Sequence, residues 1–216
     1  MPGDSPLFRE WSWAQNAAEV ELRRAHARTL VGRRVGRIRY FTLDYARLGS
    51  GGEVSGPRII QKGEEWRDPW WERPGFDTLD WGLELETDDG LIYSITWDPP
   101  GVREGIGISR APLIGTALTG ATSAAIWDVT QLSRWKAVVG QVVDNVTMRY
   151  LPWDEHGAYW CTRVSLEVSG IEIHCLLAAG HAPDDATIYR SADDVAVIFP
   201  ATQLPEWELH RTGPQD

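Results

Sequence analysis

Hydrophobic and polar positions follow the same order along two stretches of this chain. The first stretch reads Gly32-x-x-Val35-x-x-Ile38-x-Tyr40, then a hairpin pattern over 83–97, then Ile106-Gly-Ile108. The second reads Gly140-x-x-Val143-x-x-Val146-x-Met148, then a hairpin pattern over 162–177, then Ala196-Val-Ile198. Apolar residues at every second position are typical of strands with one buried face. We therefore predict two repeated β units, each consisting of a strand, a hairpin and a further strand.

The two hairpin patterns support the repeat because their apolar positions correspond. A loop at Asp88-Asp89-Gly90 would pair Leu85 with Tyr93 and Leu83 with Ile95. A loop at Ser169-Gly170 would pair Leu166 with Ile173 and Val164 with Cys175. Each loop has glycine where a tight turn needs positive φ. A shift of one residue would turn charged side chains toward the core, so this register is strongly specified.

Two helices are predicted outside the repeats. Apolar residues at spacings of three and four predict a helix from about Ser5 to Ala27. A shorter helix is predicted from Asp128 to Trp135, with Asp128 as N-cap and Gln131 completing a capping box. The weakly charged stretch 111–126 is interpreted as the connection between the two halves.

These elements predict a β-rich α+β fold, in which an N-terminal helix packs on antiparallel sheets built from two pseudo-repeated β units. We expect 1–216 to form a single domain. Its predicted parts are the N-terminal helix (1–30), the first β unit (31–110) with a long insertion (44–80), the connection with its short helix (111–135), the second β unit (136–200) and a tail (201–216).

The insertion is the main difference between the repeats. The copies are offset by 108 residues at the first strand but by 80 to 81 at the hairpin, so the first copy carries about 27 extra residues. Five aromatic residues and a net charge of −4 mark the segment 64–81. Because long loops inside compact domains are usually functional, this segment is the first candidate for a binding site.

Charge is distributed unevenly around this candidate. The chain has a net charge of −10, although residues 1–47 carry nine Arg against five acids. An acidic protein repels nucleic acid and anionic membranes and favours a cationic partner. We expect the basic residues to pair with acids of the same molecule; the alternative is a phosphate-binding surface. The basic residues concerned are Arg23, Arg24, Arg28, Arg33, Arg34, Arg37 and Arg39.

No pattern in the sequence predicts a metal site, a cofactor or a catalytic nucleophile. Cys161, His174 and Cys175 lack the spacing of a zinc site, and the hairpin register places Cys175 in the core with the other two on the opposite face. The adjacent acid pairs at 88–89, 184–185 and 193–194 are interpreted as turn residues. We therefore expect a protein that is not an enzyme and needs no cofactor.

The predicted function is capture of a basic protein partner. Aromatic rings would supply most of the buried area and the acids would steer the partner. The predicted contact residues are Trp66, Trp70, Trp71 and Phe76 with Glu64, Glu65, Asp68 and Glu72. A small, acidic, motif-poor chain with an added loop resembles, in overall character, the immunity proteins that neutralise bacterial toxins. The resemblance implies inhibition by steric occlusion. Two cysteines, no secretory leader and no spanning apolar run predict a cytoplasmic location.

Two other hypotheses remain open at this stage. One is a hydrolase or carbohydrate-active enzyme that uses loop carboxylates, foremost Asp77 and Asp80, beside tryptophan platforms for sugar rings. The other is a homo-oligomeric structural or assembly subunit, in which exposed tryptophans and the Arg-rich helix contact other copies.

Overall fold

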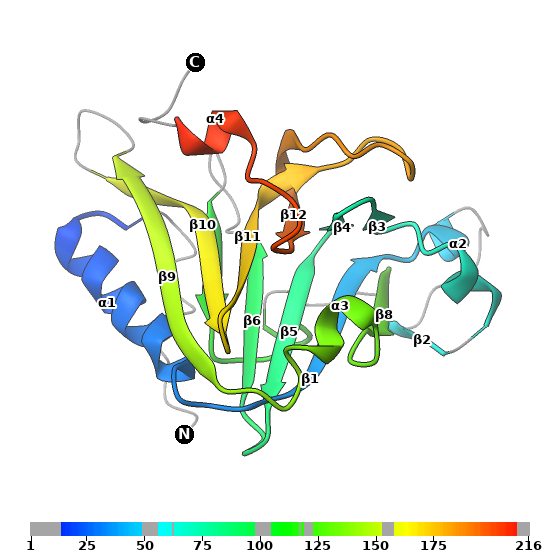
Figure 1. The fold of residues 1–216 in the computed structure, drawn as a ribbon, viewed down its shortest axis with the longest axis horizontal. Coiled ribbons are helices and arrows are strands. Elements are labelled where there is room, and N and C mark those ends of the chain that lie inside the picture. Colours follow the sequence, from blue (N-terminus) through cyan, green and yellow to red (C-terminus); the bar gives the residue numbers. More distant parts are fainter. Residues whose placement is uncertain are drawn as a thin grey trace.

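Two six-stranded sheets face each other in the computed structural model, which describes residues 14–48, 56–61, 63–97, 105–116, 118, 123–152 and 158–210 (Figure 1). The strand order is β2-β8-β1-β5-β6-β7 in the first sheet and β3-β4-β12-β11-β10-β9 in the second. Only β2 and β8 pair in parallel among the described strand pairs. The fold is therefore a strand-rich α+β fold with mainly antiparallel sheets, as predicted.

The strands of the first sheet are β1 (Val35–Leu43), β2 (Arg58–Ile60), β5 (Gly82–Thr87), β6 (Ile92–Trp97), β7 (Ile106–Ser109) and β8 (Ala124–Asp128). Those of the second sheet are β3 (Glu72–Arg73), β4 (Phe76–Leu79), β9 (Val143–Pro152), β10 (Tyr159–Val168), β11 (Ile171–Ala179) and β12 (Tyr189–Ile198).

The helices are short. The α-helices are α1 (Ala17–Ala27), α2 (Tyr45–Leu48), α3 (Ser133–Lys136) and α4 (Glu206–Leu209), and the 3₁₀ helices are η2 (Arg28–Leu30) and η3 (Glu64–Arg67). Within the described ranges, no helix has the length and apolar character needed to cross a bilayer. α1 lies along β9 (Figure 1), and Arg24 donates to the Met148 carbonyl at 3.3 Å.

The predicted repeat is present as two meanders of identical order, β1-β5-β6-β7 and β9-β10-β11-β12. The last strands of the two repeats, β7 and β12, correspond with a shift of one residue relative to the alignment of the two sequence patterns. Ile95 pairs with Ile108, and its counterpart Cys175 pairs with Val197, so Ile108 matches Val197 rather than Ile198. The sequence pattern could not reveal this shift of one residue, because Val197 and Ile198 are both apolar.

Both hairpins have the predicted register. Leu85 pairs with Tyr93, and Val164 pairs with Cys175. The Thr87 amide donates to the Leu91 carbonyl at 2.8 Å, which closes the first loop. Gly90 and Gly170 have φ of 80° and 77°, in the region that favours glycine. The turn chemistry and the buried face together specify these pairings.

The largest core lies between the sheets and contains side chains of both repeats. Tyr40, Leu83 and Ile95 come from the first sheet, and Val164 and Val197 come from the second. Smaller clusters cover the outer faces: the tail packs Leu204 and Trp207 on the second sheet, while Leu113 and Leu118 pack on the first. The sheets are therefore joined by one continuous hydrophobic interior.

Three local predictions need correction. Ala14 forms a bridge with Tyr159 and Asn16 caps α1, so the helix begins at Ala17 rather than near Ser5; residues 1–13 lie outside the described part. Asp128 ends β8 instead of capping a helix, because its carboxylate binds Arg37 and Thr130. The stretch 111–126 is more than a connection, since it contains most of β8, which pairs with β1.

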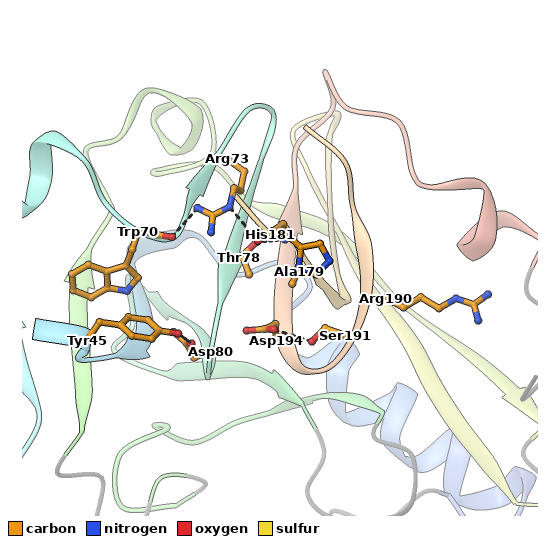
Figure 2. Close-up of a pocket in the computed structure, with 11 residues that line it drawn as sticks. Tyr45, Trp70, Arg73, Thr78, Asp80, Ala179, His181, Arg190, Ser191 and Asp194 are labelled. Carbon is orange, nitrogen blue, oxygen red and sulfur yellow. Dashed lines mark hydrogen bonds between the residues drawn. The ribbon is translucent and has the colours of Figure 1, made fainter. Parts of the chain in front are cut away.

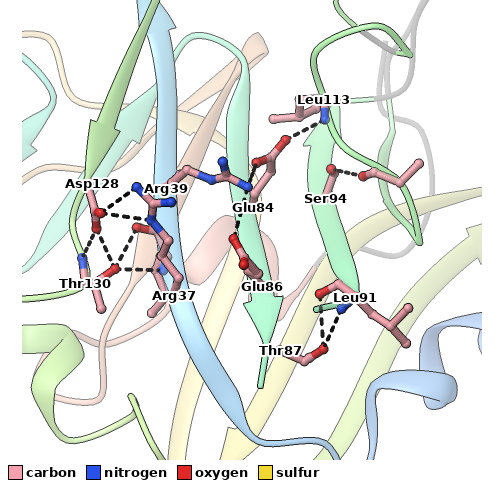
Figure 3. A network of polar contacts seen from close by, with 12 residues as sticks. Arg37, Arg39, Glu84, Glu86, Thr87, Leu91, Ser94, Leu113, Asp128 and Thr130 are labelled. Atoms are coloured by element: carbon pink, nitrogen blue, oxygen red, sulfur yellow. Dashed lines mark hydrogen bonds and ion pairs between the residues drawn. The ribbon is translucent and has the colours of Figure 1, made fainter. Parts of the chain in front are cut away.

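Five of the seven arginines of the basic segment pair with acids of the same chain, as expected: Arg24, Arg33, Arg34, Arg37 and Arg39. Arg39 lies 2.9 Å from Glu84 and 3.4 Å from Glu86 on the outer face of the first sheet (Figure 3). Arg37 lies 2.9 Å from Asp128. The second oxygen of Glu84 accepts the Leu113 amide at 2.6 Å, so the network also ties the connection to the sheet. These Arg side chains therefore have a structural role.

Candidate functional site

A pocket opens where the insertion meets the β11–β12 hairpin, and its volume is about 430 Å³ (Figure 2). This Trp70 pocket is of the size that holds a small ligand or the end of a long side chain. Its lining residues are Tyr45, Trp70, Arg73, Thr78, Asp80, Ala179, Gly180, His181, Arg190, Ser191 and Asp194. It thus combines the insertion of the first repeat with the end of the second.

One wall of the Trp70 pocket is aromatic. The rings of Tyr45 and Trp70 meet edge to face with centroids 5.7 Å apart. Trp70 in turn packs on the buried Trp127 at 4.8 Å. Thr42 accepts from both indole nitrogens, at 3.3 Å from Trp70 and 3.1 Å from Trp127. The half-buried Trp70 ring is therefore fixed by the core while part of it stays accessible.

Two carboxylates from distant parts of the chain line this pocket: Asp80 follows β4, and Asp194 lies in β12. Asp80 accepts the Leu43 amide at 2.8 Å and the hydroxyl of Tyr45. Asp194 accepts the Ser191 hydroxyl at 2.8 Å. Burial raises the pKa of Asp194, and the nearby Asp80 carboxylate raises it further. The pKa of Tyr45 is also raised, by burial and by its bond to Asp80.

The two arginines of the pocket are engaged elsewhere. Arg73 donates to the carbonyls of Trp70 at 2.7 Å, Glu72 at 2.8 Å and Gly180 at 3.4 Å. Arg190 points away from the pocket in Figure 2 and lies over the ring of Trp207 at 5.3 Å. Among the described residues, no ion pair joins a cation to Asp80 or Asp194. Within the described part of the chain, these two carboxylates therefore have no ion-pair partner.

Two of the aromatic residues predicted to contact a partner are buried. Trp71 is 0% exposed and packs edge to face on Tyr40 at 5.1 Å. Phe76 is also 0% exposed and belongs to the cluster beneath the tail. The expectation that these rings lie at the surface is wrong, because the insertion forms β3 and β4 and extends the second sheet. Trp66 is half-buried, with its ring 5.2 Å from Trp127.

The predicted acids have diverse surroundings. Glu65 lies 2.6 Å from Arg58, and Glu72 forms an ion pair with Arg134. Asp68 is exposed. Glu64 lies in η3, but its side chain is outside the described part. Glu65 and Glu72 thus hold the insertion in place through their ion pairs. Asp68 and Glu72 are both exposed to solvent.

The predicted carboxylate pair, Asp77 and Asp80, is separated by the fold. Asp77 is fully buried, and its carboxylate accepts the hydroxyl of Tyr40 at 2.7 Å and binds Arg134. Burial raises the pKa of Asp77 to about 7. Asp194, which the sequence places in a turn, lies in β12 instead, and it faces the pocket with Asp80 because Val195 pairs with Leu79. Only this long-range pairing identifies Asp194.

The cysteines also differ from expectation. Cys161 is buried in the same core cluster as Cys175, although strict alternation would place it on the opposite face. An irregularity between Cys161 and Arg163, where β10 pairs with β9, changes the alternation. Cys161 donates to the Arg163 carbonyl at 3.3 Å, and burial raises the pKa of Cys175 to about 12. Across the described residues, no group of His, Cys, Asp or Glu has the geometry to hold a metal ion.

Comparison with known proteins adds nothing to this geometry: no family model, no curated protein and no solved structure matches the chain.

Proposed function

We propose that this protein binds a basic protein partner through the Trp70 pocket and the acidic surface around it. The supporting observation is the pair of carboxylates, Asp80 and Asp194, that line an aromatic-walled cavity without an ion-pair partner among the described residues. A cationic surface would add counter-charge beyond that of Arg73, which lines the same pocket. The net charge of −10 favours approach of such a partner at long range.

Ion pairs fix the insertion to the rest of the protein, and this rigidity favours recognition of a partner. Arg58 joins Asp44, at 2.7 Å, to Glu65, and Arg134 joins Glu72 to Asp77. Binding then needs little further ordering of the chain, which lowers its entropic cost. The contact surface that we propose has Trp66 and Trp70 as aromatic residues and Asp68 and Glu72 as its exposed acids. The buried side chains of Trp71 and Phe76 lie in the interior and support this surface.

The kind of partner that we propose is a bacterial toxin domain, and the mode is steric occlusion of its cationic cleft in the cytoplasm. Immunity-type inhibitors need no chemistry of their own, only a complementary surface with high affinity. An acidic aromatic surface on a rigid scaffold meets that need.

The test uses the protein as bait in an extract of its native organism, followed by calorimetry with each isolated partner. We expect a basic protein whose affinity falls by more than tenfold in Asp68→Lys combined with Trp70→Ala, and whose binding weakens as salt increases. Asp184→Lys is the matched control, because Asp184 is exposed and does not line the pocket. Replacing Trp71 would be uninformative, since that ring is in the core. Equal affinity in all three proteins would contradict the proposal.

One observation favours a second candidate, a carbohydrate-active hydrolase. The pocket contains two carboxylates beside Trp70 and Tyr45, and a raised pKa such as that of Asp194 suits a general acid. Turnover of chromogenic glycosides that disappears in Asp194→Asn would support this candidate, and no turnover across a broad panel would remove it. The homo-oligomer hypothesis stays a prediction, which light scattering would check.

A further inference from the structure

We propose that the Trp70 pocket is a receptor for a single arginine side chain of the partner. This inference rests on the proposed function and makes it specific, because it names the group that enters the pocket. The rest of the binding surface would then position the backbone of the partner around that side chain.

The arrangement of charge is the first argument. Tyr45 and Trp70 lie on one side of the pocket, Ser191 and Asp194 lie on the other, and Asp80 lies beside the Tyr45 hydroxyl (Figure 2). A cation between them would reach the carboxylates of both Asp80, which follows β4, and Asp194, which lies in β12. The guanidinium of Arg73 offsets part of this charge from a distance, but its hydrogen bonds go to three backbone carbonyls. The site therefore keeps its preference for a cation.

The second argument is the cost of placing two carboxylates in one partly buried cavity. Asp194 is half-buried, and both Asp80 and Asp193 repel its negative charge. Such an arrangement is unfavourable in the free protein and is relieved when a cation binds. The positive charge of Arg73 offsets part of this repulsion, and the pocket is also lined by Arg190 and His181. An anionic ligand would increase the repulsion, so phosphate and carboxylate ligands do not fit.

The aromatic wall decides between the basic side chains. A guanidinium is planar and weakly hydrated, stacks on aromatic rings and forms paired hydrogen bonds with a carboxylate. An ammonium group is more strongly hydrated and loses more when it leaves water. Trp70, the best type of ring for a cation–π contact, is held by Thr42 and Trp127 with part of its surface open. The pocket therefore fits arginine better than lysine.

The experiment is an NMR titration of the wild-type protein with three blocked tripeptides, acetyl-Gly-X-Gly-amide, in which X is arginine, lysine or citrulline. Citrulline keeps the shape of arginine and lacks its charge. The readout is the indole N–H signal of Trp70, assigned with Trp70→Phe. We expect the arginine peptide to bind at least about tenfold more tightly than the citrulline peptide, and the lysine peptide to lie between them. Equal binding of arginine and citrulline would overturn the inference.

Variants locate the site. Asp80→Asn and Asp194→Asn should each weaken binding of the arginine peptide by about tenfold, whereas Asp184→Asn should leave it unchanged. A shift of the Trp70 signal by chito- or cello-oligosaccharides, with none by the arginine peptide, would favour the hydrolase and overturn the inference. Because the peptide comparison uses the wild-type protein, it remains decisive even where a variant fails to fold.

The two proposals fail in distinguishable ways. If the protein partner binds through Asp68 while the arginine peptide does not bind, the proposed function stands and the arginine pocket is wrong. If the arginine peptide binds in the pocket but no basic protein does, the pocket stands and the proposed function is wrong.

Discussion

At the scale of single residues, burial determines what each ionisable or aromatic group does. Asp77 and Asp80 are three residues apart, yet Asp77 is enclosed between the sheets and Asp80 faces a cavity. Tyr40 links Asp77 to the core, because its hydroxyl donates to the carboxylate and accepts from Trp135 at 2.7 Å. Asp77 therefore belongs to the structural network, and its protonation affects folding.

The stability of the protein should depend on pH through Asp77. The pKa is raised from 3.8 to about 7 in the folded state, so between these values the folded protein binds a proton more tightly than the unfolded chain. Stability should therefore fall as pH rises through this window, with a slope of up to about 1.4 kcal/mol per pH unit. Urea unfolding at several pH values would measure the slope.

The variant Asp77→Asn removes the titrating group, so the difference in free energy of unfolding between it and the wild type should carry the pH dependence. Asp184→Asn is the control, and its curve should follow the wild type. A wild-type curve parallel to that of Asp77→Asn between pH 4 and pH 7 would show that Asp77 does not titrate there.

At the scale of elements, close backbone contacts set which positions accept a side chain. Gly82 begins β5 with φ of 132°, and a Cβ atom there would overlap the carbonyl oxygen of Ile95 on β6. Gly170, in the second hairpin, also has positive φ but has open space around the position of a Cβ. The two glycines thus separate the effect of backbone conformation from the effect of crowding.

Gly82→Ala should destabilise the protein much more than Gly170→Ala. The second change should cost about 1 kcal/mol, the ordinary penalty for alanine at positive φ. The first adds a clash with backbone that cannot move without separating β5 from β6, so we expect a loss of at least about 3 kcal/mol. Chemical denaturation of both variants measures the difference. Similar losses would mean that β5 and β6 separate at little cost at Gly82.

At the scale of the whole molecule, the insertion joins the two repeats. Its strand β2 pairs with β8 in the first sheet, and its strand β4 pairs with β12 in the second. Trp71 lies between β2 and β4 in the sequence, and its side chain packs in the core that both sheets share. The single domain expected from the sequence would then unfold as one unit, because the largest core is shared by both sheets.

Trp71→Ala provides the test of this cooperativity. Loss of a fully buried indole should reduce the free energy of unfolding by about 3–5 kcal/mol. Hydrogen exchange should show the same loss of protection in β5 and in β10, although only β5 belongs to the repeat that carries the insertion. Protection that falls in the first sheet alone, or two separate unfolding transitions, would indicate two independent units.

The sequence by itself determined the elements whose signals are local. Alternation of apolar residues and turn glycines specified the register of both hairpins, as with Leu85 opposite Tyr93 and Val164 opposite Cys175. Capping residues were less informative: Asp128 has the chemistry of an N-cap, but its carboxylate binds Arg37 on β1 and Thr130 two residues further along the chain. Local propensity loses when a tertiary partner offers a stronger interaction.

Only the tertiary structure decided the candidate site. The sequence predicted that the insertion is a binding segment and that Trp70 is one of its contact residues. It could not show that Trp71 points inward, or that Asp194 lines the same pocket as Asp80, which is 114 residues away in the sequence. The pairing of β4 with β12 brings Asp80 and Asp194 to the same pocket, and β4 is a four-residue strand with no periodic signal long enough to predict it. Hydrophobic alternation indicates which face of a strand is buried. It does not indicate which strands pair across the molecule, because that pairing depends on tertiary packing that no local pattern encodes.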